Sequence, residues 1–244
     1  MLDWLAITTA AHPHALALIC DDQQWTYAQL NAEVSALGGW LSAQGLMPGQ
    51  QVGVLLPNSA HYVRLVHALI RLGAVIVPLN LRLTPDELRY QVQMADCALV
   101  ICDATTAQAA STLPCPLLQI DHYMPSAGSI PPREIDFEAM HAVVFTSGTS
   151  GKPKGVVLTY GNHYWGAVAS AFRLGMLPDD RWLCCLPLYH VGGLNILLRC
   201  SIYGTAVVLK RGFDLVQVKQ ALATQSITLV SLVPTMLYRL LESE

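Results

Sequence analysis

The sequence is poor in charged residues. Of its 244 residues 13% are charged, with 14 Lys and Arg against 17 Asp and Glu, and the formal net charge is −3. That charged fraction is about half the usual share for a soluble domain, whereas 53% of the residues are hydrophobic, which excludes a disordered chain. With so few basic residues the chain lacks the positive surface of a nucleic-acid-binding protein, and no nucleic-acid partner is expected.

Long uninterrupted apolar segments are also absent. The stretch that most resembles a membrane span, residues 191–209, has Arg199 at its centre and contains several glycines. A membrane-spanning helix needs about 20 mostly apolar residues without such a charge. The N-terminus carries Asp3 where a secretory signal carries a basic residue, and Pro13 interrupts its apolar run. We therefore expect a soluble protein with no membrane span and no targeting segment.

The cysteine pattern excludes two further classes. The seven cysteines include no C-x-x-C pair, and their odd number fits neither a disulfide framework nor a zinc site. Most of them lie inside apolar runs, where cysteine acts as a small core residue. We therefore expect a reducing compartment, the cytoplasm, and no metal site of the chain's own.

Short apolar runs alternate with amphipathic segments along the chain. Buried strands are predicted where these runs begin, at Val52, Ala74, Ala98, Ala142, Trp182, Thr205 and Ile227. Helical periodicity covers residues 30–41 and 62–70, Thr84 begins a capping box, and Asp214 opens another helix. Strands that alternate with helices predict an α/β fold, layered, with largely parallel sheets.

A segment rich in glycine and hydroxyl groups, FTSGTSGKPKG, follows the strand predicted from Ala142. Glycines let backbone N–H groups approach a phosphate, hydroxyls donate further hydrogen bonds, and Lys152 and Lys154 add positive charge. An ordinary Gly/Ser turn is the alternative, but such a turn does not need two lysines and further glycines in this order. A Walker-type loop requires Gly where Thr146 stands and Ser or Thr where Pro153 stands. The segment thus predicts a phosphate-binding loop of another type.

The same segment, extended to FTSGTSGKPKGVVLT, resembles the phosphate-loop signature of the adenylate-forming superfamily. That superfamily includes acyl-CoA synthetases, peptide-synthetase adenylation domains and luciferases. Other segments resemble it in the same order along the chain: WTYAQLN from Trp25, LGAVIVPLN from Leu72 and LPLYHVGGL from Leu186. The resemblance implies the fold of an acyl-CoA synthetase large domain.

Three segments, which begin at Gly161, Asp179 and Ser231, are most similar to the o-succinylbenzoate–CoA ligases of menaquinone or phylloquinone biosynthesis. The resemblance implies an ATP-dependent ligase that forms an acyl-adenylate from a carboxylic acid and then an acyl-CoA thioester. Its partners would be a small carboxylic acid, ATP with Mg²⁺ bound to the nucleotide, and coenzyme A. The sequence leaves the oligomeric state open.

The resemblance also implies the site residues. The phosphate loop would comprise Thr146, Ser147, Gly148, Thr149, Ser150 and Gly151. Lys154 would be its catalytic cation, whereas Lys152 is interpreted as a solvated charge. His190 would face the carboxylate and the adenylate phosphate and orient them, although a lone histidine in an apolar run can also be a core residue. Gly192 and Gly193 would leave room for an aromatic acyl group.

Arg199 is the sharpest indication of the substrate. A charge inside the apolar segment NILLRCSIYG costs several kcal/mol to bury unless it is paired. Since o-succinylbenzoate keeps one carboxylate after the other is activated, Arg199 would bind the spare one directly or through water. A guanidinium that reaches the surface is the alternative. Ser231 is a weaker candidate for substrate contact, with a structural role at a strand end as its alternative.

The later elements of the superfamily are missing from the sequence, among them its adenine segment, its ribose-binding Asp and its small C-terminal domain. We therefore expect a truncated large domain, with residues 56–180 as one α/β subdomain and residues 1–55 plus 181–244 as part of a second. Such a fragment is expected to be inactive alone. The alternatives are another aryl- or fatty acyl-CoA synthetase, a domain that loads a carrier protein, or a non-catalytic half-domain that binds nucleotide.

Overall fold

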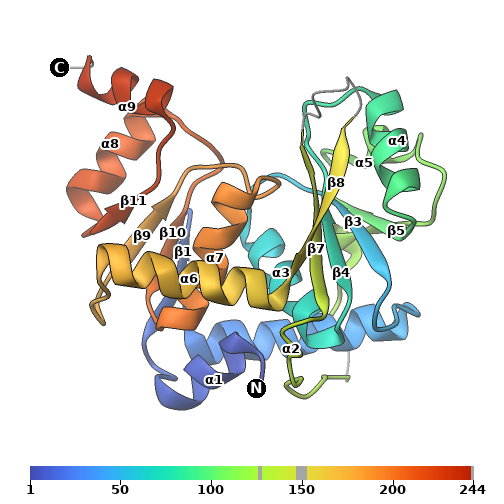
Figure 1. Ribbon diagram of the computed structural model, residues 1–244, viewed down its shortest axis with the longest axis horizontal. Helices are drawn as coiled ribbons and strands as arrows, with labels where there is room; N and C mark the ends of the chain where they lie inside the picture. The colour runs from blue at the N-terminus through green and yellow to red at the C-terminus, as the bar shows by residue number, and fades with distance from the viewer. Residues whose placement is uncertain (126–127, 147–152, 243–244) are drawn as a thin grey trace. The chain divides into compact units, whose positions relative to one another are not determined.

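The computed structural model describes residues 1–125, 128–146 and 153–242. The chain divides into two compact units, each built around one β-sheet (Figure 1). Unit 1 comprises Met1–Asp3, Ala32–Pro57 and His61–His163, and unit 2 comprises Trp4–Asn31, Asn58–Ala60 and Tyr164–Glu244. Both sheets are mostly parallel and are covered by helices, which confirms the predicted α/β class.

The described strands of unit 1 follow the order β6-β5-β3-β4-β7-β8 across its sheet. They are β3 (Gln51–Leu55), β4 (Val75–Pro78), β5 (Cys97–Cys102), β6 (Leu117–Gln119), β7 (Met140–Thr146) and β8 (Lys154–Thr159). Neighbours pair in parallel except β7 and β8, which form an antiparallel pair at the edge. The apolar runs predicted as strands in this unit are confirmed.

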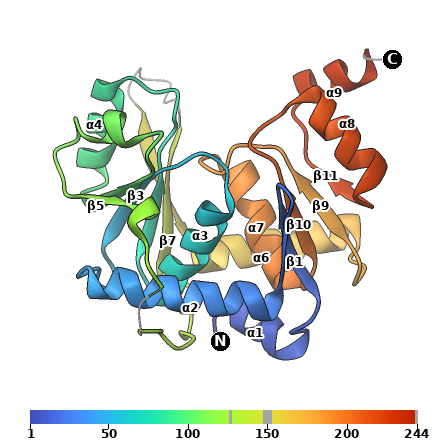
Figure 2. The ribbon, with the colours of Figure 1, turned by 180° about the vertical axis from the view of Figure 1, so that it is seen from behind.

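Helices cover both faces of the unit 1 sheet (Figure 2). On one face lie α4 (Pro85–Met94) and α5 (Ala107–Ala110), and α3 (Ala60–Leu72) lies on the other; the 3-10 helix η1 (Ile120–His122) follows β6. Strands buried on both faces need apolar side chains in both orientations, which explains the continuous apolar runs. The predicted start of α4 is confirmed, since the Thr84 hydroxyl accepts from Glu87 N and the Glu87 carboxylate accepts from Thr84 N.

The described strands of unit 2 follow the order β11-β9-β10-β1-β2. They are β1 (Leu16–Cys20), β2 (Gln23–Thr26), β9 (Arg181–Cys184), β10 (Ala206–Leu209) and β11 (Leu229–Val230), and β2 alone among them is antiparallel to its neighbour. The remaining helices are α1 (Trp4–Ala11), α2 (Tyr27–Ala43), α6 (Tyr160–Leu174), α7 (Val191–Tyr203), α8 (Leu215–Thr224) and α9 (Pro234–Leu241); α2 and α6 supply residues to both units.

The two faces of the unit 2 sheet carry different helices. Ile19, Leu183 and Val208 pack with Val218 of α8 in one cluster. Because side chains alternate along a strand, Trp182, which precedes Leu183, points to the opposite face. There α1 and α7 meet, and the Thr8 hydroxyl donates to the Ser201 carbonyl at 2.6 Å.

The boundaries of the units differ from the expected subdomains. β3 and residues 32–43 of α2 lie in unit 1, because β3 pairs with β4 and β5. Residues 164–180 lie in unit 2, where the Tyr203 hydroxyl of α7 donates to the Ala167 carbonyl of α6. The pairing of β1 with β10 does join the N-terminal segment to the part of the chain after Trp182.

A buried ion pair anchors the N-terminal residues of unit 1. Arg71 donates from Nε and Nη2 to the two carboxylate oxygens of Asp3 at 3.2 and 3.0 Å, and the side chains are 1% and 4% exposed. The Arg133 backbone N–H also donates to Asp3. Such bidentate geometry offsets the cost of burying both charges.

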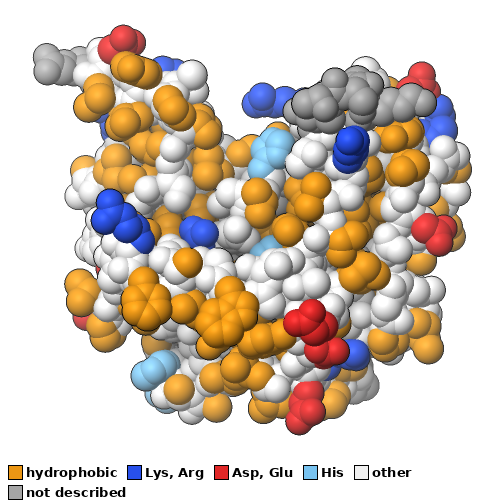
Figure 3. Space-filling model, in the orientation of Figure 1, with side chains coloured by type: hydrophobic (Ala, Val, Ile, Leu, Met, Phe, Trp, Pro, Cys, Tyr) orange, Lys and Arg blue, Asp and Glu red, His pale blue; other side chains and the backbone are white. Residues whose placement is uncertain are grey.

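The surface of unit 2 exposes apolar side chains along α6 and the turn after it (Figure 3). Trp165 is 63% exposed, Phe172 89% and Leu177 67%. Among the described residues, no helix is both long enough and apolar enough to cross a membrane.

Buried histidines cluster in unit 1 at the start of β7. His141 is 1% exposed, and neither of its ring nitrogens has a hydrogen-bond partner among the described residues. Its ring lies 4.9 Å from that of Tyr160 and 4.7 Å from that of His163, measured between centroids. Burial, reinforced by His163 and His67, lowers the pKa of His141 well below its usual value. Burial also lowers the pKa of His67 to about 4.

These histidines predict a loss of stability in acid. A histidine that is neutral in the folded state but protonates near pH 6.5 when unfolded stabilises the fold above that pH. As the pH falls below 6.5, each such group should lower the free energy of unfolding by about 1.4 kcal/mol per pH unit. In urea unfolding between pH 7.5 and 5, H141F should show a shallower pH dependence than the wild type. The control H14Q, at an exposed histidine, should have the same pH dependence of the free energy of unfolding as the wild type. If H141F also had the wild-type pH dependence, burial of a neutral His141 would not be the cause of the loss of stability in acid.

Candidate functional site

The predicted phosphate segment begins and ends in unit 1, on the antiparallel strands β7 and β8. Thr146, the last residue of β7, is the register partner of Lys154, the first residue of β8, and both are exposed. The predicted residues between them, Ser147, Gly148, Thr149, Ser150 and Gly151, lie outside the described residues, as does Lys152. The structure therefore places the two ends of the segment side by side.

Two contacts hold this pair of strands. The Tyr90 hydroxyl of α4 donates to the Pro153 carbonyl at 3.3 Å, one residue before Lys154. At the other end, the β7–β8 register shifts between Met140 and Ala142, and the His141 ring there packs on Tyr160 in the first turn of α6. Such irregularities in a ladder often re-aim a side chain. Helices α4 and α6 thus brace the strands that lead to and from the predicted loop.

His190 is the N-cap residue of α7 in unit 2. Its backbone carbonyl accepts from Gly193 N and Leu194 N, both at 3.0 Å, whereas its side chain makes no capping hydrogen bond. The imidazole is exposed and lies 4.7 Å from the Tyr189 ring. A core role is thereby excluded, and the ring stands at the start of a helix, where a backbone N–H environment favours anions.

The two glycines after His190 differ in role. A Cβ added to Gly193 would lie 2.3 Å from the Pro187 carbonyl oxygen, so Gly193 is required for close packing against that loop. The space expected beside it is thus filled by backbone. At the exposed Gly192 an added Cβ would meet only Leu186 Cδ1, at 3.4 Å. The open position is therefore that of Gly192.

Arg199 shares one face of α7 with Gly192. Residues seven apart lie on the same side of a helix, about 10 Å apart along its axis. Gly192 is exposed and Arg199 half-buried, whereas Leu194 and residues 196–198 are buried. The face of α7 that solvent reaches therefore carries a small residue at its start and a cation two turns later.

A tryptophan that the sequence analysis did not single out connects Arg199 with Ser231. Arg199 Cζ lies 5.6 Å from the centroid of the Trp182 ring. Trp182 Nε1 donates to Ser231 Oγ at 3.1 Å. The structure thus brings together, through Trp182, two residues predicted from separate segments. Arg199 Nε is buried, and no acceptor for it exists among the described residues.

A second residue without a sequence signal, Asn58, shapes the segment before His190. Its Nδ2 donates to the Leu186 carbonyl at 2.9 Å and to the Lys210 carbonyl at 3.0 Å, and its Oδ1 accepts from Leu188 N at 2.8 Å. The side chain is 5% exposed, and the Leu188 N–H whose hydrogen bond it accepts is buried. Asn58 fixes the backbone two residues before His190.

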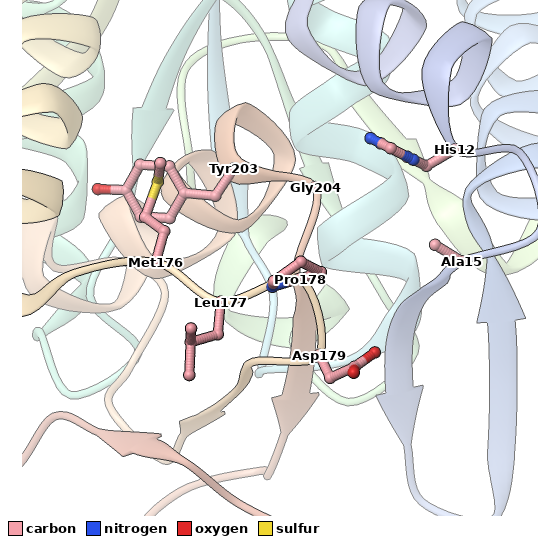
Figure 4. A pocket seen from close by; sticks show the side chains of 8 residues that line it. All are labelled: His12, Ala15, Met176, Leu177, Pro178, Asp179, Tyr203 and Gly204. Carbon is pink, nitrogen blue, oxygen red and sulfur yellow. The ribbon is translucent and has the colours of Figure 1, made fainter.

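Pockets elsewhere in unit 2 contain none of the predicted residues. One of about 310 Å³ is lined by His12 after α1, by residues 176–179, and by Tyr203 and Gly204 (Figure 4). Another of about 400 Å³ lies between α6 and α7. Over the described ranges, no group of three or more His, Cys, Asp or Glu side chains could hold a metal ion. All seven cysteines are free thiols.

Comparison with known proteins identifies the class. The family model described as AMP-binding enzyme matches residues 5–244. The chain belongs to this family.

Individual relatives of the chain are named as ligases of one substrate. A 2-succinylbenzoate–CoA ligase of Bacillus cereus strain Q1 is 38% identical over 99% of this chain, and one of Bacillus pumilus is 38% identical over 98%. The chain spans about half the length of these relatives, 50% of each.

Solved structures show the same likeness. The o-succinylbenzoate–CoA synthetase of Bacillus subtilis with its acyl-adenylate intermediate matches 100% of this chain and 65% of its own, with a TM-score of 0.95 and 35% identity. The same enzyme with ATP and magnesium matches with a TM-score of 0.94 at 34% identity, over 100% of this chain and 67% of its own.

Loss of the Asn58 side chain should destabilise unit 2. N58A removes a donor from the Leu186 and Lys210 carbonyls and the acceptor of the buried Leu188 N–H, and we expect a loss of about 3 kcal/mol in the free energy of unfolding measured in urea. N58D should be at least as destabilising, since it keeps the acceptor for Leu188 N but brings a carboxylate against two carbonyls. The control N80A removes one surface hydrogen bond, to Arg82 N, and should cost less than about 1 kcal/mol. Equal losses for N58A and N80A would contradict this role.

Proposed function

We propose that the protein containing this chain is an ATP-dependent acid–CoA ligase that acts on o-succinylbenzoate in menaquinone or phylloquinone biosynthesis. In the first step a substrate carboxylate oxygen attacks the α-phosphate of ATP, which gives an acyl-adenylate and pyrophosphate. In the second the thiolate of coenzyme A attacks the acyl carbonyl, which gives the thioester and AMP. The similarity to 2-succinylbenzoate–CoA ligases and to a synthetase solved with its acyl-adenylate supports this proposal.

The observation that carries the choice of substrate is the environment of Arg199. The guanidinium lies on the accessible face of α7, its Nε is buried, and the described residues provide no acceptor for that N–H. A buried donor without an acceptor is costly, and a carboxylate is the strongest partner for it. An acid with a second carboxylate, beyond the one activated, supplies that partner.

The same face of α7 would accommodate the rest of such an acid. Gly192 is exposed and has no side chain beside the start of the helix, about 10 Å from Arg199 along the axis. His190 at the N-cap would orient the reacting carboxylate, and its exposed imidazole is not assigned a nucleophilic role. Ser231 accepts from Trp182 and keeps its own O–H as a donor toward substrate.

The nucleotide would be held by the segment between β7 and β8. Thr146 and Lys154 at its ends, with residues 147–151 between them, would bind the triphosphate through hydroxyl, backbone N–H and ammonium groups. Their contribution is to neutralise charge and align two anions, which otherwise repel each other. Mg²⁺ would come bound to ATP, because the described residues hold no metal-ligating cluster.

Arg199→Ala should impair use of the dicarboxylate selectively. Loss of a charge-assisted contact worth about 1.5–3 kcal/mol corresponds to a reduction of roughly 10- to 150-fold in kcat/KM for o-succinylbenzoate. For analogues that lack the spare carboxylate the reduction should be only a few-fold. The measurement is acid-dependent release of pyrophosphate from ATP by the encoded protein.

The control R173A removes an exposed arginine in the last turn of α6 and should leave both rates unchanged. An equal reduction by R199A on both kinds of acid would overturn the role of Arg199. Pyrophosphate release with other aryl or fatty acids but not with o-succinylbenzoate would favour the alternative ligases. Nucleotide binding without release for any acid would favour a non-catalytic domain.

A further inference from the structure

We propose that Trp182 is a positioning residue for substrate selection, because its ring holds Arg199 and Ser231 in one arrangement. This inference rests on the proposed function. It assigns the preference for a dicarboxylate to a group of three side chains from β9, α7 and the end of β11 rather than to Arg199 alone.

Trp182 is fixed by its place in the sheet. It is 3% exposed and lies in β9, where it is the register partner of Val207 on β10 and of Leu229 on β11. A side chain packed between a sheet and a helix has little freedom to change rotamer. The ring therefore offers a fixed surface to the helix α7 above it.

The contact between the Trp182 ring and Arg199 leaves the arginine able to bind a substrate carboxylate. A guanidinium within about 6 Å of an indole centroid is attracted by the negative face of the ring. The indole ring offers no oxygen acceptor to the guanidinium, so the Arg199 N–H groups stay available for a carboxylate. Within the described part of the chain no Asp or Glu forms an ion pair with Arg199. Trp182 thus holds the charge without neutralising it.

The contact with Ser231 uses a different part of the same ring. The indole N–H is a donor only, so Ser231 Oγ must accept, and its own proton is directed elsewhere. The face of the ring therefore orients the cation on α7, while its edge orients a hydroxyl after β11. Both groups become oriented donors for an anionic substrate, as a preorganised site requires.

Substitutions of Trp182 can distinguish the effect of its aromatic face on Arg199 from the effect of its N–H group on Ser231. The quantity measured is selectivity, the ratio of kcat/KM for o-succinylbenzoate to kcat/KM for each analogue that lacks one carboxylate. W182F keeps an aromatic face but loses the N–H, and we expect selectivity to fall only a few-fold. W182L loses the face as well, and selectivity should fall at least tenfold. S231A should match W182F, and the double variant W182F/S231A should be no worse than either.

Two further variants keep the inference falsifiable if W182L does not fold. R199K retains the charge but not the planar guanidinium, so it should lose selectivity nearly as far as R199A. The control W165L removes a tryptophan that is 63% exposed on α6 and should leave selectivity unchanged.

The outcomes distinguish this inference from the function on which it rests. Selectivity that R199A abolishes but that W182F, W182L and R199K all retain would overturn the role of Trp182 and leave the proposed function standing. A wild-type protein without preference for the dicarboxylate would overturn the proposed substrate, and the role of Trp182 with it.

Discussion

Burial of the central strands on both faces is the constraint on which the rest of this structure depends. A sheet covered by helices on each side leaves little room for polar groups along its strands, so most of the residues predicted to bind nucleotide and substrate lie at strand ends and at a helix start. Thr146 ends β7, Lys154 begins β8, and His190 is the N-cap of α7. The same constraint makes the chain rich in valine, leucine and isoleucine and poor in charged residues, because strands buried on both faces need apolar side chains at successive positions.

Polar groups that do enter the interior differ in how they are satisfied, and the difference is informative. Two buried polar groups have hydrogen-bond partners within the protein and stabilise the fold: the ion pair of Asp3 with Arg71, and Asn58 with its three backbone partners. Arg199 is held by an aromatic face and keeps an N–H without an acceptor in the described structure. A buried donor is costly to leave without an acceptor, and under the proposed function a carboxylate of the substrate would supply the acceptor for Arg199.

The sequence predicted the parts of the fold that depend on local pattern. Apolar runs located β3, β4, β5, β7, β9 and β10, and the capping box at Thr84 located the start of α4, because both signals are carried by neighbouring residues. The buried strand β1 was not predicted, and the run from Ile227 forms only the short strand β11, neither of whose residues is buried. Helix α1 was not predicted, since WLAITTAA has no acidic residue in its first turn and no basic residue in its last. The division into units also differed, because it depends on β3 pairing with strands later in the chain, which no local pattern reveals. For the site, the motif predicts a phosphate-binding segment at residues 146–154 and an orienting role for His190, and both stay predictions. Trp182 and Asn58 were missed because their roles arise from contacts between segments 17 to 152 residues apart along the chain, and Gly193 proved to be needed for packing.

We propose that residues 146–154 bind the triphosphate of ATP. A crystal structure of the encoded protein with a non-hydrolysable ATP analogue and Mg²⁺ tests it most directly. We predict phosphate oxygens within hydrogen-bond distance of the Thr146 hydroxyl, of backbone N–H groups that follow it, and of the Lys154 ammonium. Nucleotide bound at another place, with these groups making no contact to phosphate, would contradict the account.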